Sequence, residues 1–287
     1  MKQRRSRAHG NLHLQLAVDR CPLLGETSRM PIIACSTGSF NVVVSGRDNA
    51  PVLLLSNSLT CDLSMWNAQV DALSDHFRVV RYDGRGQRAS FTTAGPYTME
   101  QLGRDALSVL DALELQQVHF CGLSMGGMVG MWLLTHAPQR IRKAVLANTA
   151  AFMGPASLWD GRIALARRGG MAAVVEPTLA RWFPKAFHAS APATVAAMQP
   201  AILATPVEGY VACCEAIRDM DQREAIRSVD IPTLVIVGAN DPATTPADGQ
   251  VIHGSIAGSR LITLPAGHIS AVETPEAFGR EVVAFLS

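Results

Sequence analysis

Residues 118–127 read Val-His-Phe-Cys-Gly-Leu-Ser-Met-Gly-Gly, and this stretch decides the fold of the chain. A short apolar run leads into the motif Gly-x-Ser-x-Gly, with Gly122 and Gly126 on either side of Ser124. The two glycines allow a sharp turn from a buried strand into a helix, because a side chain at either position would collide with the turn. Ser124 would then lie at the apex with a free hydroxyl, which indicates a nucleophile.

Ser124 needs two partners, because a serine hydroxyl attacks only after a base has taken its proton. Downstream, Asp241 follows the β-branched apolar run 233–237, and His268 follows the strand-like run 261–264. The chain order Ser124, Asp241, His268 is that of the α/β-hydrolases, whereas chymotrypsin-like and subtilisin-like enzymes use other orders. We therefore predict a catalytic triad of nucleophile, acid and base. Asp83 also ends a strand-like run, but it precedes the serine and is expected to shape a loop.

Strand-like runs alternate with helix-like stretches along most of the chain. The expected strands are 40–44, 52–55, 78–82, 118–121, 144–147, 233–237 and 261–264, and the expected helices include 66–73, 99–113, 128–135 and 275–286. Continuous apolar strands are typical of a mostly parallel sheet whose two faces are covered by helices. The sequence therefore predicts an α/β architecture, the α/β-hydrolase fold, with a mostly parallel central sheet.

The alternation stops between about residues 149 and 230, where the chain is rich in Ala, Pro, Trp and Arg at helical spacing. We predict a core made of residues 30–148 and 232–287, with an inserted helical cap at 149–231. Residues 1–29 stand apart, because they are basic and hold no apolar run long enough for a secretory signal. They are interpreted as a flexible arm, or as the product of an upstream start codon with the functional protein beginning at Met30.

Composition excludes several classes of protein. The 287-residue chain is 48% hydrophobic and 17% charged, which is typical of a globular protein with a large core. Its net charge of +1 gives no indication of a nucleic-acid partner. A membrane-spanning helix needs an apolar run of about 18 residues, and since the sequence has none, no membrane association is expected. The six cysteines show no Cys-x-x-Cys pair and no metal-ligand spacing, which favours a reducing cytoplasm and no metal site.

Acyl transfer also needs two hydrogen-bond donors aimed at the oxygen that becomes charged, and backbone N–H groups supply them without reorganisation. One donor is expected from Met125, which follows the nucleophile and begins a helix whose dipole favours negative charge. The other is expected from the loop after the strand 52–55. That loop reads Ser-Asn-Ser-Leu-Thr at residues 56–60.

Several stretches resemble the 3-oxoadipate enol-lactonases, a family of the α/β-hydrolase superfamily, over roughly residues 35–287. They are Leu-Ser-Asn-Ser-Leu-Thr-Cys-Asp-Leu-Ser-Met-Trp (55–66), His-Phe-Cys-Gly-Leu-Ser-Met-Gly-Gly (119–127), Leu-Ala-Asn-Thr-Ala (146–150) and Gly-Tyr-Val-Ala-Cys-Cys-Glu-Ala-Ile-Arg-Asp-Met-Asp (209–221). The resemblance implies hydrolysis of 3-oxoadipate enol-lactone to 3-oxoadipate, in the bacterial breakdown of protocatechuate or catechol, with no metal or organic cofactor.

The resemblance also bears on the loop at 56–60. Many relatives carry His-Gly where this chain has Asn57 and Ser58, which implies that Leu59 provides the second oxyanion donor. Asn57 and Ser58 become candidate substrate-binding residues. A second loop departs from the family pattern Asp-x-Arg-Gly-His-Gly-x-Ser, which appears here as Asp-Gly-Arg-Gly-Gln-Arg-Ala-Ser at 83–90. Arg88 replaces a glycine there, so a turn that needs a positive φ is expected to change locally, without effect on the chemistry.

The substrate that the resemblance implies carries a free carboxylate, so a cationic or donor-rich cap is expected. The available residues are Trp159, Arg162, Arg181, Trp182 and Lys185. The sequence does not choose among them, nor does it predict the oligomeric state. Two other functions stay open: a broad carboxylesterase or cofactor-free perhydrolase on the same triad, and a non-catalytic ligand binder on the hydrolase fold.

Overall fold

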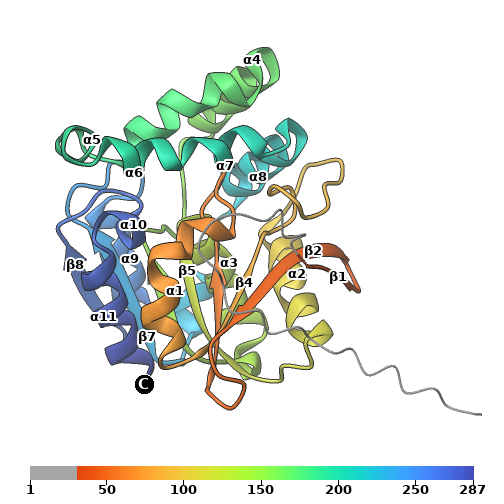
Figure 1. The fold of residues 1–287 in the computed structure, drawn as a ribbon, viewed down its shortest axis with the longest axis vertical. Helices are drawn as coiled ribbons and strands as arrows, with labels where there is room; N and C mark the ends of the chain where they lie inside the picture. The colour runs from red at the N-terminus through yellow and green to blue at the C-terminus, as the bar shows by residue number, and fades with distance from the viewer. Residues whose placement is uncertain (1–30) are drawn as a thin grey trace, which may run out of the picture.

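The computed structural model describes residues 31–287, so the expected arm at 1–29 lies outside the described residues. At its centre is an eight-stranded sheet in the order β1-β2-β4-β3-β5-β6-β7-β8 (Figure 1). The pairings of β1 with β2 and of β2 with β4 are antiparallel, and all the others are parallel, which confirms the predicted α/β fold. The strands are β1 (Ile32–Cys35), β2 (Gly38–Ser45), β3 (Val52–Ser56), β4 (Arg78–Tyr82), β5 (Val118–Leu123), β6 (Ile141–Ala147), β7 (Thr233–Gly238) and β8 (Arg260–Leu264).

The apolar runs expected to be strands all lie inside β2 to β8. The inner strands β5 and β7 are buried at every residue, which is why they read as continuous apolar runs. The sequence does not predict β1. Its four residues alternate between exposed and half-buried positions at the edge of the sheet, so the strand contributes almost no buried apolar run.

Helices cover both faces of the sheet (Figure 1). On one face α1 (Asn67–Ser74) packs against α11 (Pro275–Leu286), and on the other α2 (Met99–Ala112) packs against α3 (Met125–His136). The sequence does not predict α9 (Pro246–Ser255), which packs on β7 and β8. Only Gly249 and Ile252 of α9 are buried, so its apolar stripe is too narrow to give a helical period.

A layer of helices lies across the end of the sheet from which β5, β6 and β7 lead into their following segments (Figure 1). These helices connect β6 to β7, and all of them lie inside the stretch 149–231. None of the described helices is both long and apolar enough to cross a membrane. The cap helices are α4 (Ala156–Trp182), α5 (Lys185–Ser190), α6 (Pro192–Ala197), α7 (Gln199–Ala204) and α8 (Val207–Asp219).

The longest cap helix, α4, is broken in the middle. Gly170 has a φ of +64°, outside the helical region, so the two halves of α4 run in different directions. Glycine reaches this conformation without steric cost. The break matters for the site described below, because Arg162 precedes it and Arg181 follows it.

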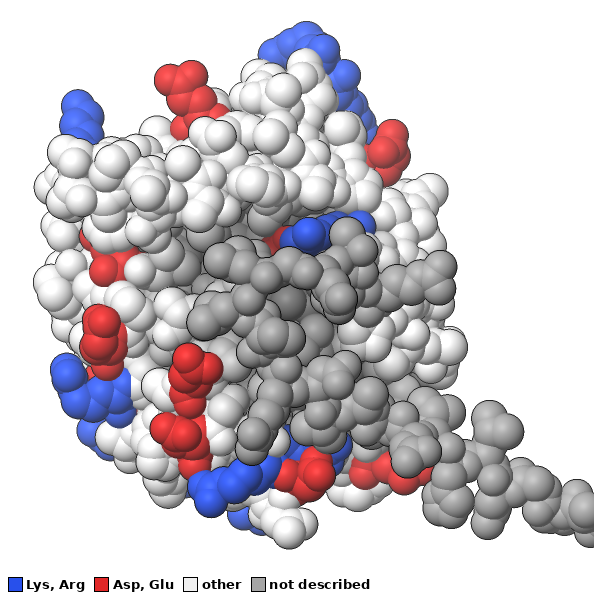
Figure 2. All heavy atoms as spheres, viewed as in Figure 1, with Lys and Arg blue, Asp and Glu red and all other residues white. Residues whose placement is uncertain are grey.

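Few charges lie on the face of the cap that Figure 2 shows. In Figure 2 the upper part of the molecule is mostly uncharged, with charged side chains of both signs at its margins and along the lower edge. Two leucines of the cap, Leu158 and Leu203, are more than half exposed. The cationic side chains inside the cap therefore do not belong to a broad basic surface on this face.

Backbone contacts fasten the cap to the core at several places, and two of them lie at the ends of the long cap helices. Gly209, in the first turn of α8, packs on Gly86, and a Cβ at Gly209 would lie 2.4 Å from the Gly86 carbonyl oxygen. At the far end of α4, the carbonyl of Trp182 accepts a hydrogen bond of 2.8 Å from the N–H of His268. Neither contact depends on a flexible side chain, so the cap is held closely against the core.

The contact between Gly209 and Gly86 gives a test of this attachment. In Gly209→Ala the new methyl group meets backbone on the core side, which has no rotamer to relieve the clash. Overpacking of this kind costs about 1–3 kcal/mol, so we expect the thermal midpoint to fall by about 2–12 °C. Differential scanning calorimetry measures the change.

Gly161→Ala is the matched control, because Gly161 is also a helical glycine of the cap but a Cβ there meets no atom within 4 Å. Its midpoint should stay unchanged or rise slightly, since alanine favours helix. Equal midpoints for the two variants would show that the backbone contact at Gly86 does not hold the cap.

Candidate active site

Ser124 lies at the turn between β5 and α3 with a φ of +58° and a ψ of −116°. This conformation is strained for a residue with a side chain and persists only when its surroundings impose it. Both flanking glycines are required by space. A Cβ at Gly122 would lie 2.3 Å from the Gly126 carbonyl oxygen, and one at Gly126 would lie 2.1 Å from that of Ser56. The strand-turn-helix predicted from the motif is therefore present.

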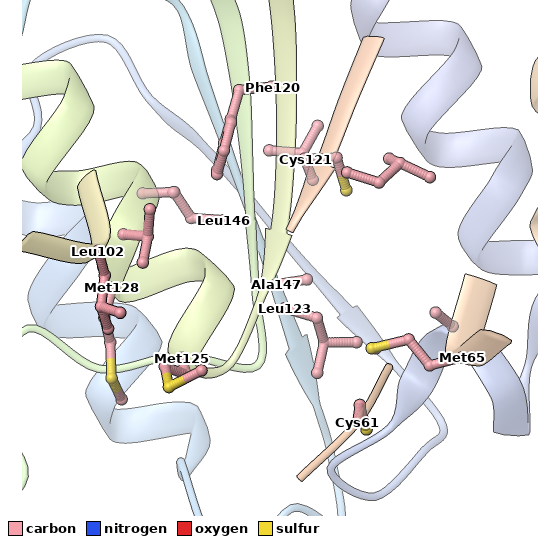
Figure 3. Close-up of a cluster of buried hydrophobic side chains, with 14 of the residues drawn as sticks. Cys61, Met65, Leu102, Phe120, Cys121, Leu123, Met125, Met128, Leu146 and Ala147 are labelled. Atoms are coloured by element: carbon pink, nitrogen blue, oxygen red, sulfur yellow. The ribbon is translucent and has the colours of Figure 1, made fainter. Parts of the chain in front are cut away.

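Packed apolar side chains surround the strand ends that lead into the turn. Figure 3 shows Leu123 and Ala147 side by side at the ends of their strands, with Met125 and Met128 on one side and Met65 and Cys61 on the other. All of them are buried. The backbone N–H of Ser124 donates to the carbonyl of Ala147 over 2.9 Å. This dense packing and the hydrogen bond fix the strained residue in place.

The structure brings Ser124, His268 and Asp241 together. The Nε2 atom of His268 lies 2.9 Å from the Ser124 hydroxyl, and its Nδ1 atom lies 2.8 Å from a carboxylate oxygen of Asp241. All three side chains are buried, with at most 7% of any of the residues exposed. The histidine can therefore take the serine proton while the carboxylate fixes which ring nitrogen carries a hydrogen.

The carboxylate of Asp241 is held in its ionised form. Burial alone would raise its pKa, but the neighbouring His268, the backbone N–H of Thr244 and the amide of Asn148 lower the pKa below its ordinary value. The Thr244 hydroxyl donates to the same carboxylate over 2.8 Å. Asp241 is therefore charged at neutral pH and able to stabilise a protonated His268.

Asn148 is a part of this site that the sequence reasoning missed. It follows β6, has a φ of +44°, and donates from its side-chain amide to Asp241 over 3.1 Å and to the carbonyl of Gly267 over 3.0 Å. It therefore ties the loop of the acid to the loop of the histidine. The sequence does carry one signal for Asn148: it comes directly after β6, which lies between β5 and β7. Because the carboxyl ends of parallel strands share one edge of the sheet, a residue at this position is expected near Ser124 and Asp241.

The two expected oxyanion donors lie on either side of Ser124. Met125 is the first residue of α3, and the first N–H groups of a helix have no acceptor within it. Leu59 is half-buried and lines the same cavity as Ser124. The N–H of Leu59 belongs to the peptide unit whose carbonyl is that of Ser58. Since a peptide is planar, whatever fixes this carbonyl also fixes the N–H on its other side.

Gln87 fixes that peptide unit, a role the sequence does not predict. Its side-chain amide donates to the Ser58 carbonyl over 2.9 Å and accepts from the N–H of Gly84 over 2.8 Å. It also accepts from the Asn57 amide over 3.2 Å. The residue is buried, with 2% of its surface exposed. Gln87, together with the N–H of Cys61 that donates to the same carbonyl over 3.1 Å, thus holds the loop 56–60 and fixes the plane of the peptide that contains the N–H of Leu59.

Asn57 and Ser58, both candidate substrate contacts, have different surroundings. Asn57 lies outside the cavity lining, and its buried amide accepts from the Trp66 indole and donates to the Tyr82 carbonyl, each over 2.8 Å. Its hydrogen bonds therefore hold the loop. Ser58 does line the cavity, and among residues 31–287 its buried hydroxyl has no nitrogen or oxygen partner.

Arg88 stands where the family pattern has glycine, and it adopts a positive φ. Its φ is +35°, so the positive value survives the substitution. The guanidinium forms an ion pair with Asp62, whose carboxylate also accepts from the N–H of Ser64 at the start of a short helix. The expected change of this turn is therefore wrong as far as the sign of φ is concerned, because the Arg88 side chain gains a buried partner.

A small cavity separates the triad from the cap. It measures about 40 Å³, which is space for a few water molecules. Among the described residues, no three His, Cys, Asp or Glu side chains are grouped as metal ligands. The core contributes Ser58, Leu59, Thr60, Ser124, Met128, Ala243, Thr244 and His268, and the cap region contributes Met153, Trp159, Arg162, Thr178, Arg181, Trp182, Tyr210 and Ile217.

Arg162 and Arg181 both line this cavity, and so do Trp159 and Trp182. Lys185, in contrast, is exposed and lies outside the lining. The guanidinium of Arg162 lies over the Trp159 ring, 4.3 Å from its centre, and Arg181 donates to the Thr178 hydroxyl over 3.2 Å. Within the described part of the chain, neither arginine forms an ion pair with a carboxylate. Burial, together with the charge of Arg162, lowers the pKa of Arg181 to about 10. This site suits an anion.

Comparison with known proteins agrees with this geometry. A family model described as the alpha/beta hydrolase fold matches residues 51–275. The chain is 42% identical over 248 residues to 3-oxoadipate enol-lactonase 2 of Acinetobacter baylyi, covering 86% of this chain and 93% of the relative. The enol-lactonase structure from Burkholderia xenovorans has a TM-score of 0.87 and 43% identity, covering 89% of this chain and 99% of that one. A hydrolase structure from Pseudomonas aeruginosa has a TM-score of 0.88 and 45% identity, covering 91% of this chain and 100% of that one.

The geometry predicts how the site reacts with a phosphonofluoridate, a reagent that phosphonylates activated serines. We expect one label per chain, on Ser124, because its hydroxyl lies 2.9 Å from His268, whose other ring nitrogen is held by the carboxylate of Asp241. Intact-protein mass spectrometry with peptide mapping measures the label. Ser124→Ala should take up none, and His268→Ala should react far more slowly.

His136→Ala provides the control, since His136 is exposed and stacks on Trp132 away from the cavity. This variant should be labelled at the rate of the unaltered protein. A label that persists in Ser124→Ala would assign the nucleophile to another residue.

Proposed function

We propose that this chain opens the ring of 3-oxoadipate enol-lactone through an acyl-enzyme on Ser124. The chain belongs to the 3-oxoadipate enol-lactonase family of the α/β-hydrolase fold, so it is a lactone or ester hydrolase. One observation carries the proposal: Ser124 and its base His268, which Asp241 holds from behind, line a single cavity with two arginines that have no acidic partner among residues 31–287. The cavity therefore combines a nucleophile for the lactone carbonyl with a site for the substrate carboxylate.

In the first step His268 takes the proton of Ser124 through Nε2, and the serine oxygen attacks the lactone carbonyl. The N–H groups of Leu59 and Met125 stabilise the negative charge that forms on the carbonyl oxygen. Asp241 stays ionised and stabilises the protonated imidazole. The ring C–O bond then breaks, and His268 delivers its proton to the departing oxygen. This oxygen becomes an enol that remains tethered to the acyl group.

In the second step a water molecule gives its proton to His268 and attacks the acyl carbon. The bond to Ser124 breaks, the proton returns to the serine oxygen, and the diacid is released. The enol meanwhile converts to the ketone, which is a poor nucleophile. The ring therefore does not close again, and hydrolysis runs in one direction.

Arg162 and Arg181 are the groups we assign to the substrate carboxylate. A guanidinium binds a carboxylate through two parallel hydrogen bonds, and these strengthen where water is excluded. Trp159, Trp182 and Tyr210 form the apolar walls around the rest of the ligand. Binding of the remote carboxylate orients the lactone carbonyl at Ser124, so it raises the rate of the chemical step as well as the affinity.

The setting of the reaction follows from the same family membership. We place it in the bacterial breakdown of protocatechuate or catechol, in the cytoplasm. The five cysteines within the described residues are free thiols, which supports a reducing compartment. The partner is a small-molecule lactone, and no nucleic acid, membrane or cofactor takes part in the proposed reaction.

Substrate preference tests the proposal. The purified protein should hydrolyse 3-oxoadipate enol-lactone far better than 4-nitrophenyl acetate, because the acetate ester has no carboxylate for the arginines. Ser124→Ala should lower kcat by about 10⁶-fold. Arg181→Gln should reduce kcat/KM for the lactone by at least about tenfold, the lower end for a lost charged hydrogen bond. Spectrophotometric assays of both substrates measure these values.

Arg168→Gln is the control, because Arg168 is an exposed arginine of the same helix outside the cavity lining. It should behave as the unaltered protein does. Comparable kcat/KM values on the two substrates would favour a broad carboxylesterase. No turnover of either substrate, with Ser124 intact, would favour a ligand binder.

Gln87→Met tests the support of the oxyanion loop. Methionine keeps the length of the side chain but removes the Gln87 donor to the Ser58 carbonyl. This carbonyl then keeps only its 3.1 Å hydrogen bond from the N–H of Cys61, so the N–H of Leu59 is held less firmly. Loss of a whole oxyanion donor costs about 10²–10³-fold in kcat, and a misaligned donor should cost about tenfold or more. We expect KM to change little, since the ground-state carbonyl depends less on this donor.

Steady-state kinetics with the lactone separates kcat from KM, and a thermal melt reports on folding. Gln139→Met, at an exposed glutamine outside the site, should leave both parameters unchanged. A Gln87→Met protein that melts at a lower temperature but keeps its kcat would assign Gln87 to stability alone.

A further inference from the structure

In the ring-opened ligand, the carboxylate that the arginines are proposed to hold belongs to the acyl part. This follows from the proposed function and the structure of the lactone. Ring opening breaks a bond inside the molecule, so the carboxylate stays connected to the carbonyl carbon through the carbon chain. The acyl-enzyme on Ser124 is then a six-carbon chain that carries a ketone and ends in a free carboxylate. Arg162 and Arg181 line the same cavity as Ser124 and are the groups available to hold that far end.

Nothing in the arrangement of side chains requires a ring. His268 activates Ser124 toward any ester carbonyl, and backbone N–H groups stabilise the resulting oxyanion whatever the leaving group is. The ring contributes only a leaving oxygen that stays attached. In an open-chain ester the alcohol must fit beside the triad. A small alcohol such as methanol adds only two heavy atoms there.

We propose that the enzyme also hydrolyses open-chain half-esters of six-carbon dicarboxylic acids with small alcohols. Monomethyl adipate is the simplest member of this class. Its free carboxylate binds to Arg162 and Arg181, and its ester carbonyl lies at Ser124. This inference rests on the proposed function, because it takes the chain length and the role of the arginines from the lactone reaction.

The reaction balances with water as the only co-reactant. The Ser124 oxygen forms a bond to the ester carbon, the bond to the methoxy oxygen breaks, and the serine proton passes through His268 to methanol. The intermediate is the adipyl ester of Ser124 with its terminal carboxylate free. Water then forms a bond to the acyl carbon through its oxygen, and one of its protons passes through His268 to the departing serine oxygen. The products are methanol and adipic acid, which ionises.

The charge at the far end of the chain determines selectivity among such esters. Dimethyl adipate has the same carbon chain and the same reacting ester, but its far end is neutral. Bound in this cavity it would leave two guanidinium groups without an anion, one of them with its pKa lowered to about 10, first by burial and then by the charge of the other. A hydrogen bond to a charged group is lost, so we expect the half-ester to be preferred about 10- to 100-fold in kcat/KM.

The test measures methanol release from monomethyl adipate, monomethyl succinate and dimethyl adipate, with 3-oxoadipate enol-lactone assayed in parallel. We expect monomethyl adipate to exceed dimethyl adipate by at least about tenfold. Monomethyl succinate should be poorer than monomethyl adipate, because its shorter chain holds the carboxylate away from the arginines. Succinate and adipate half-esters that react equally would overturn the six-carbon assignment.

Variants locate the selectivity. Arg162→Gln and Arg181→Gln should each lower kcat/KM for monomethyl adipate more than for the diester, which narrows the ratio between the two. Arg168→Gln should keep the ratio, since Arg168 is exposed on the same helix and outside the cavity lining. A thermal melt of each variant checks that it is folded. An unchanged ratio in both cavity variants would overturn the role of the arginines.

The lactone assay separates the two proposals. If the lactone is hydrolysed and monomethyl adipate reacts no faster than the diester, the half-ester activity is wrong and the proposed function stands. If neither reacts, the proposed function fails and the inference fails with it. If the half-ester reacts with the expected preference and the lactone does not, the half-ester activity is confirmed and the lactone reaction of the proposed function is wrong.

Discussion

The left-handed backbone of Ser124 is the constraint on which the rest of the structure depends. β5 runs through the middle of the sheet, and the chain must turn within one residue into α3. The turn leaves space for no side chain at Gly122 or Gly126. It also brings the first N–H groups of α3 beside the serine hydroxyl, and it places β3, which leads into the loop of Leu59, directly against the new helix. The nucleophile and the setting of both oxyanion donors thus arise from one local geometry.

The cap depends on the same kind of close approach. Gly209 meets Gly86 backbone to backbone, and Trp182 accepts from the N–H of His268. These contacts define where the cap lies, and the break at Gly170 then brings Arg162 and Arg181 over one cavity. Charge is scarce on the cap face of Figure 2, whereas Arg162 and Arg181, which form no ion pair with the described residues, lie enclosed in the cavity.

The sequence predicts those features whose signal is local. The glycines around Ser124, the apolar strands before Asp241 and His268, and the loss of strands beyond residue 149 all depend on short spacings, and they define the fold and the three side chains that meet. The chemistry of guanidinium favours Arg162 and Arg181 over Lys185 as carboxylate ligands, but nothing in a cap helix of low periodicity says which of these side chains faces inward. Gln87 and Asn148 could not be found in this way. Their hydrogen bonds join loops far apart in the chain, and only the folded sheet brings those loops together.

The hydrogen bond from His268 to the carbonyl of Trp182 has a consequence for how such enzymes diverge. Trp182 is the neighbour of Arg181, so the residue proposed to bind the anion and the residue that positions the base are adjacent in the chain. A cap exchanged between relatives would therefore bring its own alignment of the histidine along with its own specificity. At this point the position of the catalytic histidine depends on the cap as well as on the core. New substrates are reached more readily by side-chain replacement within the cap than by recombination at its ends.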